Sequence, residues 1–338
     1  MYNVSSYLDA YVRSIFEQSF KDFKVLCIND GSTDDTLQHI RELTQNDARF
    51  TILTHENRGV YYNYKLALER VDTPYFSILD PDDWYAPNHL ELLYQAIQKD
   101  DADLAKGSLV RNYPSQSSNH TSTASHDASI ERLDHRNDTI RKDIQRGHHP
   151  ARHNCGSQWI SHLYKTDFVK KNAISFYTRD DGFEWDGDDI FLLSILLKQP
   201  KIVFCDDAHY HYLQRATSAV HQINPLRFTS TVKSRQIETQ ILNAAYRNGS
   251  LSKEDYLAIF SRFLIELSKH FRIYQKAKGF DPNAYVEALS EIVESADLCP
   301  SFSFVKHAKA HHDEKIIRQL SNPFLYAMDR IKAFSLGY

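Results

Sequence analysis

The sequence has few cysteines, and none of them forms a Cys-x-x-Cys pair. The four cysteines among the 338 residues are Cys27, Cys155, Cys205 and Cys299. Widely separated cysteines argue against a disulfide framework and against a zinc knuckle. Their spacing instead favours a reducing compartment, and we expect a cytoplasmic protein.

Long apolar runs are missing as well. No run approaches the roughly 18 residues that a membrane span needs, and the N-terminus lacks the basic-then-apolar pattern of a signal peptide. Any contact with a membrane is therefore expected to be peripheral, on its inner face. Glycine and proline occur ten times each and the formal net charge is −4. These values argue against a disordered chain and against electrostatic attraction to nucleic acid.

The first hundred residues alternate between strand and helix patterns. Short apolar runs at residues 23–28, 50–53 and 75–79 predict buried strands. Apolar residues at helical spacing predict helices over residues 4–18, 32–43, 59–70 and 88–99. Because strands separated by helices imply right-handed crossovers, we predict an α/β fold with a mixed, mostly parallel sheet and flanking helices.

The composition divides the rest of the chain into three parts. Residues 114–153 are polar, and we predict a variable loop that holds one helix at residues 127–145. The histidines there could suggest a metal site, but they have no fixed spacing, so a solvated loop is favoured. We place the domain boundary at residue 222. The domain of residues 1–222 is then followed by a helical domain of residues 223–338, with helices at residues 225–248, 252–278, 281–296 and 322–334.

A cluster of carboxylates follows the third predicted strand. Asp80, Asp82 and Asp83 stand in a turn that contains Pro81. In open α/β sheets, ligands bind in the crevice at the carboxyl ends of the strands. Carboxylates are the ligands that Mg²⁺ or Mn²⁺ prefers, and such ions are usually shared with substrate phosphates. The local pattern alone is also typical of a turn that caps the next helix. Other motifs in the sequence are needed to choose between a metal site and a capping turn.

Two further acidic turns occur in the chain. Asp30 follows the first predicted strand and could accept hydrogen bonds from a base or a ribose, or serve as an ordinary turn residue. Asp188 and Asp189 precede an apolar helix, where they could cap the helix or provide a general base for a hydroxyl nucleophile.

Taken together and in this order, the three turns resemble the family 2 glycosyltransferases of the GT-A fold. Residues 2–18 resemble the family's opening Y-N-x-x-x-Y-L helix, residues 28–34 its V-N-D-G-S-T-D turn and residues 76–84 its F-x-x-x-D-x-D-D-W stretch. Weaker matches are the E-N-x-G turn at 56–59, Trp159 with residues 163–165, the acidic turn at 187–189, and Tyr210, Tyr212, Arg215 and Ser218. The resemblance covers roughly residues 1–220. Within the family, the chain is most similar in style to bacterial enzymes that build capsule, lipopolysaccharide or wall polysaccharides.

The resemblance implies roles for residues at the matched positions. Asp189 would be the catalytic base, and Asp188 would help to position the acceptor. Asp82 would bind Mn²⁺ or Mg²⁺, with Asp80 and Asp83 beside it. The residues assigned to the nucleotide-sugar donor, expected to be a UDP-sugar, are Asp30, Asn3, Asn57, Asp80, Lys65, Arg215 and Ser218. The implied reaction inverts the anomeric configuration of the donated sugar.

The chain also departs from the family pattern. The family has a strand ahead of the residues that match Tyr2 and Asn3, so we expect a sheet that lacks this strand or is completed by another segment. Tyr64 stands where the family commonly has arginine, and Lys65 follows it. Asp188 replaces the more usual glutamate and is one methylene shorter.

Two other functions compete with a glycosyltransferase that acts on a glycan or lipid-linked acceptor. A nucleotidyltransferase would normally carry an N-terminal Gly-rich basic loop, and this sequence has none. A degenerate, non-catalytic sugar-nucleotide or glycan-binding module is the other alternative. The apolar stripe near residues 260–271 is expected to be core. The amphipathic tail at residues 324–336 suits membrane-surface contact or self-association into a homo-oligomer.

Overall fold

The computed structural model of the chain describes residues 1–113, 129–133, 136–153, 158–183, 185–215, 225–274 and 282–298. Its contacts divide into two compact units. Unit 1 comprises Met1–Gly147, Cys155–Asp181 and Gln199–His221, and unit 2 comprises His148–Asn154, Gly182–Lys198 and Gln222–Tyr338. The segment Gly182–Lys198, which the sequence placed in the first domain, thus clusters with the C-terminal helices.

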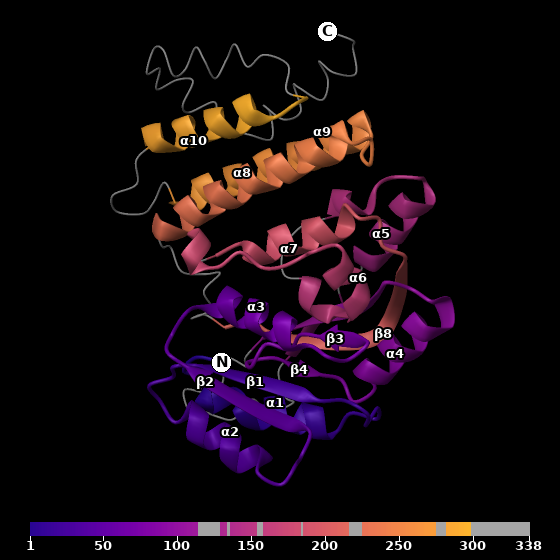
Figure 1. Cartoon of the computed structure of the whole chain (residues 1–338), viewed down its shortest axis with the longest axis vertical. Coiled ribbons are helices and arrows are strands. Elements are labelled where there is room, and N and C mark those ends of the chain that lie inside the picture. The colour runs from indigo at the N-terminus through magenta and orange to yellow at the C-terminus, as the bar shows by residue number, and fades with distance from the viewer. Residues whose placement is uncertain are drawn as a thin grey trace. The chain divides into compact units, whose positions relative to one another are not determined.

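Unit 1 begins with the predicted alternation of helices and strands (Figure 1). After the short turn η1 (Ser5–Tyr7) come α1 (Leu8–Phe16), β1 (Val25–Asp30), α2 (Thr36–Thr44), β2 (Phe50–His55) and α3 (Val60–Arg70). β1 and β2 pair in parallel, with Val25 opposite Phe50 and Asp30 opposite His55. Both strands therefore end at the same edge, and the turns that follow them meet there.

A second, larger sheet holds the remaining strands of unit 1. Its members are β3 (Tyr75–Ser77), β4 (Trp84–Tyr85), β5 (Leu104–Tyr113), β6 (Ser129–Leu133), β7 (His162–Lys165) and β8 (Ile202–Leu213). The strand order is β3-β7-β5-β8-β4, and β6 pairs with β5. Among the described strands only β1–β2 and β5–β8 are parallel pairs, and the others are antiparallel. The mixed α/β sheet is confirmed, although its parallel share is smaller than we predicted.

The edge of β1 that faces away from β2 is bonded by the first residue of the sequence. The amino group of Met1 donates to the Ile28 carbonyl at 2.7 Å, and the Asp30 N–H donates to the Met1 carbonyl at 2.8 Å. Alternate bonding of one residue to two positions of its neighbour is the pattern of a parallel ladder. Met1 thus extends the β1–β2 sheet by one residue, where the resemblance implied a further strand.

Two apolar clusters form the core of unit 1. One joins α1, β1 and α2 through Leu8, Val12, Cys27 and Ile40, among others. The other packs α4 (His89–Asp100) against the large sheet and contains Leu93, Ile97, Ala105, Leu163 and Ala208. α4 ends at Asp101, whose left-handed φ of 43° closes the helix.

The polar segment of residues 114–153 contains more structure than predicted. The helix expected over residues 127–145 is present as α5 (Arg136–Gln145), and it starts later than expected. Ser129–Leu133 forms β6, which pairs with β5. We predicted no strand here, because a five-residue edge strand with polar positions resembles a loop. Residues 114–128, 134 and 135 lie outside the described part of the chain.

Short elements complete unit 1 and begin unit 2. In unit 1 these are η3 (Gln158–Ser161), α6 (Thr166–Lys171) and η4 (Arg179–Asp181). Unit 2 contains η2 (Pro150–His153), α7 (Gly187–Leu196), α8 (Pro225–Arg247), α9 (Lys253–Tyr274) and α10 (Pro282–Ser295). These last three helices match the predicted ones closely. The helix predicted at residues 322–334 and the amphipathic tail lie outside the described residues.

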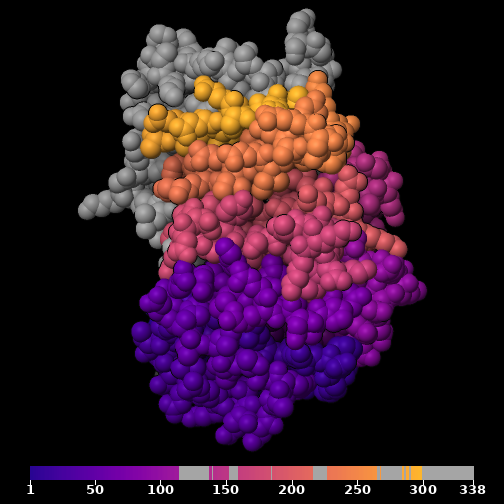
Figure 2. All heavy atoms as spheres, viewed as in Figure 1, coloured from indigo at the N-terminus to yellow at the C-terminus, as the bar shows by residue number. Residues whose placement is uncertain are grey.

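The helices of unit 2 bury a continuous apolar face. α8 packs against α7, α9 and α10, and the atoms of these helices, coloured from pink to yellow, form adjacent bands in Figure 2. Phe260, Phe263, Leu264 and Leu267 of the expected stripe are buried. Within the described residues, no helix is long and apolar enough to cross a membrane.

We expect Leu93→Ala to lower the free energy of unfolding by about 2–5 kcal/mol, because truncation of a buried leucine leaves a cavity. The Leu93 side chain is 0% exposed in the cluster under the large sheet. Urea unfolding measures the change. Val60→Ala is the control, since Val60 is 46% exposed and its truncation should change stability by no more than about 0.5 kcal/mol. Equal losses in both variants would contradict this placement of the core.

Candidate active site

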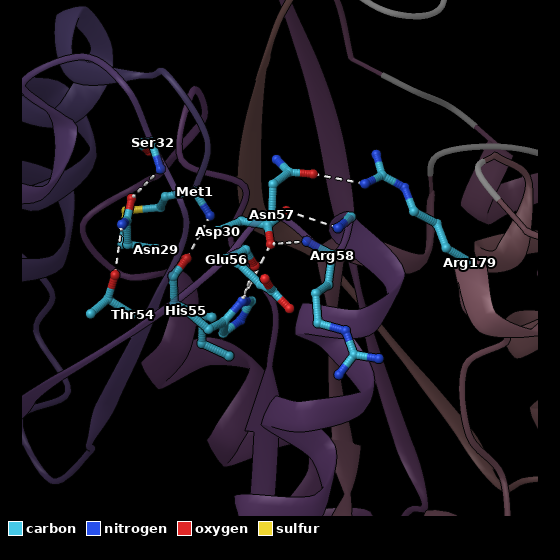
Figure 3. A network of polar contacts seen from close by, with 12 residues as sticks. Met1, Asn29, Asp30, Ser32, Thr54, His55, Glu56, Asn57, Arg58 and Arg179 are labelled. Carbon is cyan, nitrogen blue, oxygen red and sulfur yellow. Dashed lines mark hydrogen bonds and ion pairs between the residues drawn. The ribbon is translucent and has the colours of Figure 1, made fainter.

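Asp30 joins the turn after β1 to the turn after β2. Its Oδ1 accepts a hydrogen bond from the Arg58 N–H at 2.8 Å, and its Oδ2 accepts one from the Gly59 N–H at 3.0 Å (Figure 3). His55 Nδ1 lies 3.5 Å from the same carboxylate. Asp30 is buried, so this carboxylate fixes the start of α3 against the end of β1.

The two turns approach each other closely at Gly31. Gly31 has a φ of +68°, and a Cβ atom there would lie 2.8 Å from the Asn57 backbone nitrogen. Only glycine fits both the left-handed conformation and this contact. On the far side, the Arg179 Nη1 donates to the Asn57 side-chain oxygen at 2.7 Å, and the Arg58 guanidinium pairs with Asp180 at 2.5 Å (Figure 3 shows the Asn57–Arg179 bond). The turn at residues 56–59 is therefore held from both sides.

Asn3 holds the residues that follow Gly31. Its side-chain oxygen accepts from the Thr33 N–H at 2.9 Å, and its own N–H donates to the Ser32 hydroxyl at 3.1 Å. Asn3 has a φ of 52°, a left-handed conformation that asparagine tolerates. These bonds bring Asn3, Asp30 and Asn57, three predicted donor-binding residues, to one edge of the β1–β2 sheet.

The second acidic turn follows β3. The Tyr64 hydroxyl donates to Asp80 Oδ1 at 2.5 Å, and the Asp80 N–H donates to the Tyr210 hydroxyl at 3.2 Å. Burial, and next to it the negative charge of Asp82, raise the pKa of Asp80 to about 6. Tyr64 thus partners Asp80 with a neutral hydroxyl where the family commonly has a cation.

Asp83 plays a different part from its neighbours. Its Oδ2 accepts from the Tyr210 hydroxyl at 2.7 Å, and its Oδ1 accepts from the Leu213 N–H at 2.8 Å. The residue is 1% exposed, and burial followed by repulsion from Asp82 raises the pKa of its carboxyl well above the usual range. Both oxygens are used to hold the turn to β8, which gives Asp83 a structural role rather than the predicted one of metal ligand.

Asp82 is the carboxylate of this turn that faces a cation. The Arg215 Nη2 lies 2.5 Å from Asp82 Oδ2, and the guanidinium rests 4.8 Å from the centre of the Tyr7 ring. The pKa of Arg215 is raised, because the attraction of Asp82 and neighbouring groups outweighs the cost of burial. Arg215 and Asp82, assigned to donor and metal from the sequence, are therefore in direct contact.

The residues of this turn fit a divalent ion that is shared with a ligand. Burial, and after it repulsion among the carboxylates, raises the pKa of Asp80 and of Asp83, so negative charge is concentrated at this point. No group of three or more potential ligand side chains occurs among the described residues. Mg²⁺ is usually bound by one or two carboxylates together with substrate phosphates, so Asp82 with Asp80 suffices for such a site.

The third acidic turn lies in unit 2, at the start of α7. Asp188 and Asp189 occupy the first turn of this helix, where carboxylates face the positive end of the helix dipole. The Arg235 Nη2 on α8 lies 2.6 Å from Asp189 Oδ2. The predicted base is therefore paired with a buried guanidinium that the sequence did not reveal.

Two further residues, Lys65 and Ser218, were predicted to bind the donor. Lys65 is half-buried on α3, next to Tyr64. Ser218 lies outside the described residues. Tyr210, Arg179 and Arg235 contact the predicted turns in the structure, and we did not predict these contacts from the sequence. Only Tyr210 gave a signal, as part of the Tyr-x-Tyr pattern in β8.

The profile of the family described as "Glycosyl transferase family 2" matches residues 1–161. Over these residues the chain is therefore similar to the family 2 glycosyltransferases. It is 27% identical over 219 residues to "Glycosyltransferase GlyG" of Streptococcus pneumoniae, a match that covers 64% of this chain and 70% of that protein. It is 33% identical over 107 residues to "Glycosyltransferase GlyA" of the same organism, which is 32% of this chain but 15% of that protein. The chain thus spans a small part of some of its curated relatives.

Solved structures share the fold. The S. aureus TarS 1–349 structure in complex with UDP-GlcNAc superposes with a TM-score of 0.66 at 17% identity, covering 96% of this chain and 90% of that one. The mannosyltransferase PcManGT from Pyrobaculum calidifontis, in complex with GDP-Man and Mn²⁺, gives a TM-score of 0.52 at 12% identity, covering 97% and 83%. The GT-A fold predicted from the sequence is confirmed.

We expect Asp83→Ala to destabilise the protein by about 1–3 kcal/mol, because the Tyr210 hydroxyl and the Leu213 N–H lose their buried acceptor. Asp82→Ala is the matched control, one residue earlier in the same turn. It removes repulsion from Asp80 and Asp83, so its stability should be unchanged or higher. Urea unfolding of both variants measures the difference, and a larger loss in Asp82→Ala would refute the structural role of Asp83.

Proposed function

We propose that this protein is an inverting glycosyltransferase that moves a sugar from a UDP-sugar to a hydroxyl group of a glycan or lipid-linked acceptor in bacterial surface polysaccharide synthesis. The carboxylate pair of Asp80 and Asp82 after β3 carries the proposal, since it concentrates negative charge that a shared cation would balance. The match to the family profile and the UDP-GlcNAc complex of the TarS neighbour support it.

At the donor, Asp82 and Asp80 would hold Mn²⁺ or Mg²⁺. When bound, the ion supplies Lewis-acid neutralisation of the charge that grows on the leaving diphosphate. Arg215 already lies beside Asp82, and a guanidinium matches phosphate geometry. We therefore assign Arg215 to the diphosphate. Asp30, Asn3 and Asn57 act on the nucleotide by shaping the turns at the end of β1 and β2, and we place Lys65 and Ser218 in the same donor group.

At the acceptor, Asp189 would act as the general base. It takes the proton of the acceptor hydroxyl while the hydroxyl oxygen attacks the anomeric carbon and the bond to the diphosphate breaks. Attack on the face opposite the leaving group inverts the configuration. Asp188, on the same helical turn, would help to position the acceptor.

One observation favours the second candidate, a non-catalytic sugar-nucleotide or glycan-binding module. Tyr64 gives Asp80 a neutral hydroxyl partner, which leaves less positive charge for a diphosphate than the family's common arginine would. Release of UDP from a UDP-sugar in the presence of Mn²⁺ separates the candidates, because a binding module retains the intact donor.

The setting of the reaction belongs to the proposal too. We place it in the cytoplasm, with peripheral membrane contact or homo-oligomer formation through the C-terminal helices. Residues 1–222 would form the catalytic domain and residues 223–338 the helical one. Liposome flotation of the intact chain and of a chain that ends at Ser321 tests the contact assigned to the tail.

We predict that Asp82→Asn weakens Mn²⁺-dependent binding of UDP by about tenfold or more, equal to at least about 1.4 kcal/mol. The loss of one charged ligand lowers affinity for the ion that joins protein and diphosphate. Isothermal titration of UDP with and without Mn²⁺ measures this. Asp72→Asn is the control, since Asp72 forms an exposed pair with Lys24. The same Mn²⁺-dependent affinity in Asp82→Asn and the parent would remove Asp82 from the metal site.

We predict that Asp189→Asn lowers sugar transfer by about 10²–10⁴-fold, the usual contribution of a general base. Donor affinity should stay within a factor of about two, because the base acts on the acceptor. Coupled detection of UDP release measures turnover and calorimetry measures UDP binding. A variant that loses UDP affinity to the same degree as turnover would argue for a donor role of Asp189 instead.

A further inference from the structure

One face of α8 is lined with polar side chains that contact the segment around the proposed base. These residues follow helical spacing and are all buried: Ser230, Thr231, Ser234, Arg235 and Glu238. A buried polar face on a helix is costly unless each group is bonded. The hydrogen bonds of these side chains therefore indicate the role of this polar face.

The first contacts fix the backbone ahead of α7. The Ser230 hydroxyl accepts from the Trp185 N–H at 3.0 Å and donates to the Trp185 carbonyl at 2.7 Å. The Thr231 hydroxyl donates to the Asp186 carboxylate, and the Ser234 hydroxyl donates to the Asp186 carbonyl at 3.1 Å. Asp186 has a left-handed φ of 63°, a strained conformation that persists only when its surroundings impose it. The bonds from α8 impose it, and they set where α7 begins.

Arg235 continues this face to the proposed base itself. Its guanidinium donates to Asp189 Oδ2 at 2.6 Å and to the Glu238 carboxyl group, and it lies 5.3 Å from the centre of the Phe263 ring on α9. The side chain is 4% exposed. A planar guanidinium held by an aromatic ring and a second acid presents its N–H groups in one fixed direction.

Three acids act on Arg235, namely Asp189, Glu238 and Asp186. A second arginine, Arg227, lies 4.0 Å from Asp186. Burial raises the pKa of Glu238 to about 8, although Arg235 opposes this rise. Arg235 thus joins Glu238 on its own helix to Asp189 on α7.

We propose that Arg235 is a positioning residue for the base Asp189. This inference rests on the proposed function and deepens it. Arg235 holds one oxygen of the Asp189 carboxylate and so sets the plane of that carboxylate. In this orientation the carboxylate takes the proton of the acceptor hydroxyl as the new bond to the anomeric carbon forms and the bond to the diphosphate breaks.

A purely structural ion pair is the competing explanation. In that case, loss of Arg235 lowers the stability of unit 2 but leaves the turnover of the folded protein unchanged. A positioning role changes kcat of the folded protein while donor affinity stays the same, and a lysine at this position restores part of kcat. These readouts separate the two explanations.

The experiment compares Arg235→Met and Arg235→Lys with Arg247→Met in the full chain. Arg247 is the matched control, since it lies on the same helix and forms an exposed pair with Asp297. The probe is Mn²⁺-dependent hydrolysis of a panel of UDP-sugars, in which water takes the place of the acceptor. Calorimetry with UDP and thermal unfolding accompany each variant.

We expect Arg235→Met to lower kcat on the order of 10- to 100-fold, since misplacing a catalytic group by about 1 Å can cost about 100-fold. UDP affinity should stay within about twofold. Arg235→Lys should recover part of the kcat that Arg235→Met loses but stay below the parent, since an ammonium group restores the charge and cannot reproduce the planar, forked geometry of the guanidinium N–H groups. Arg247→Met should match the parent.

A parental kcat in folded Arg235→Met would overturn the positioning role. If that variant does not fold, Arg235→Lys decides, and a parental kcat in this variant with an unchanged melting temperature overturns it equally. Absence of hydrolysis of every UDP-sugar by the parent protein would instead overturn the proposed function, and this role with it.

Discussion

The buried carboxylate of Asp30 is the contact on which the N-terminal part of unit 1 depends. It accepts backbone hydrogen bonds from Arg58 and Gly59, which directly precede α3, while it stands at the end of β1. Parallel pairing brings the ends of β1 and β2 to one edge, but pairing alone does not fix the turns beyond them. Asp30 provides that constraint, and the close approach at Gly31 follows from it. These contacts fix the edge without a ligand. Less conformational entropy is then lost when a ligand binds.

The turn after β3 differs from the edge at Asp30, because the charges that would bind a ligand there lower the stability of the fold. Three carboxylates lie together with one nearby guanidinium, that of Arg215. Such an arrangement costs folding free energy, because each buried charge repels the next. Proteins tolerate such costs at sites where a ligand balances the charge. Asp83 offsets part of this cost by bonding to β8, so one member of the cluster anchors the other two.

Local patterns in the sequence predicted the helices and strands of residues 1–100 apart from β4, and the helices α5, α7 and α8 to α10. They did not predict strands β5, β7 and β8 or helix α6. Apolar period, glycine turns and acidic positions at strand ends are all local signals. They could not separate the structural Asp83 from Asp82, because its partners Tyr210 and Leu213 stand 127 and 130 residues away. They could not reveal Arg235 either, which is 46 residues from Asp189 on a helix whose pattern indicates only packing. β6 was not predicted, because its composition does not indicate a strand. It forms one through its pairing with β5.

The polar face of α8 bears on how such proteins can recombine during evolution. The family profile ends at residue 161, yet the turn that carries Asp186 and Asp189 has its partners on a helix that begins at Pro225. A crossover near residue 222 would join one ancestor's turn to another ancestor's helix. Such a chimaera would retain every recognisable family motif while its buried acids met unmatched side chains. The turn and α8 are therefore expected to be inherited as one module, despite their distance in sequence.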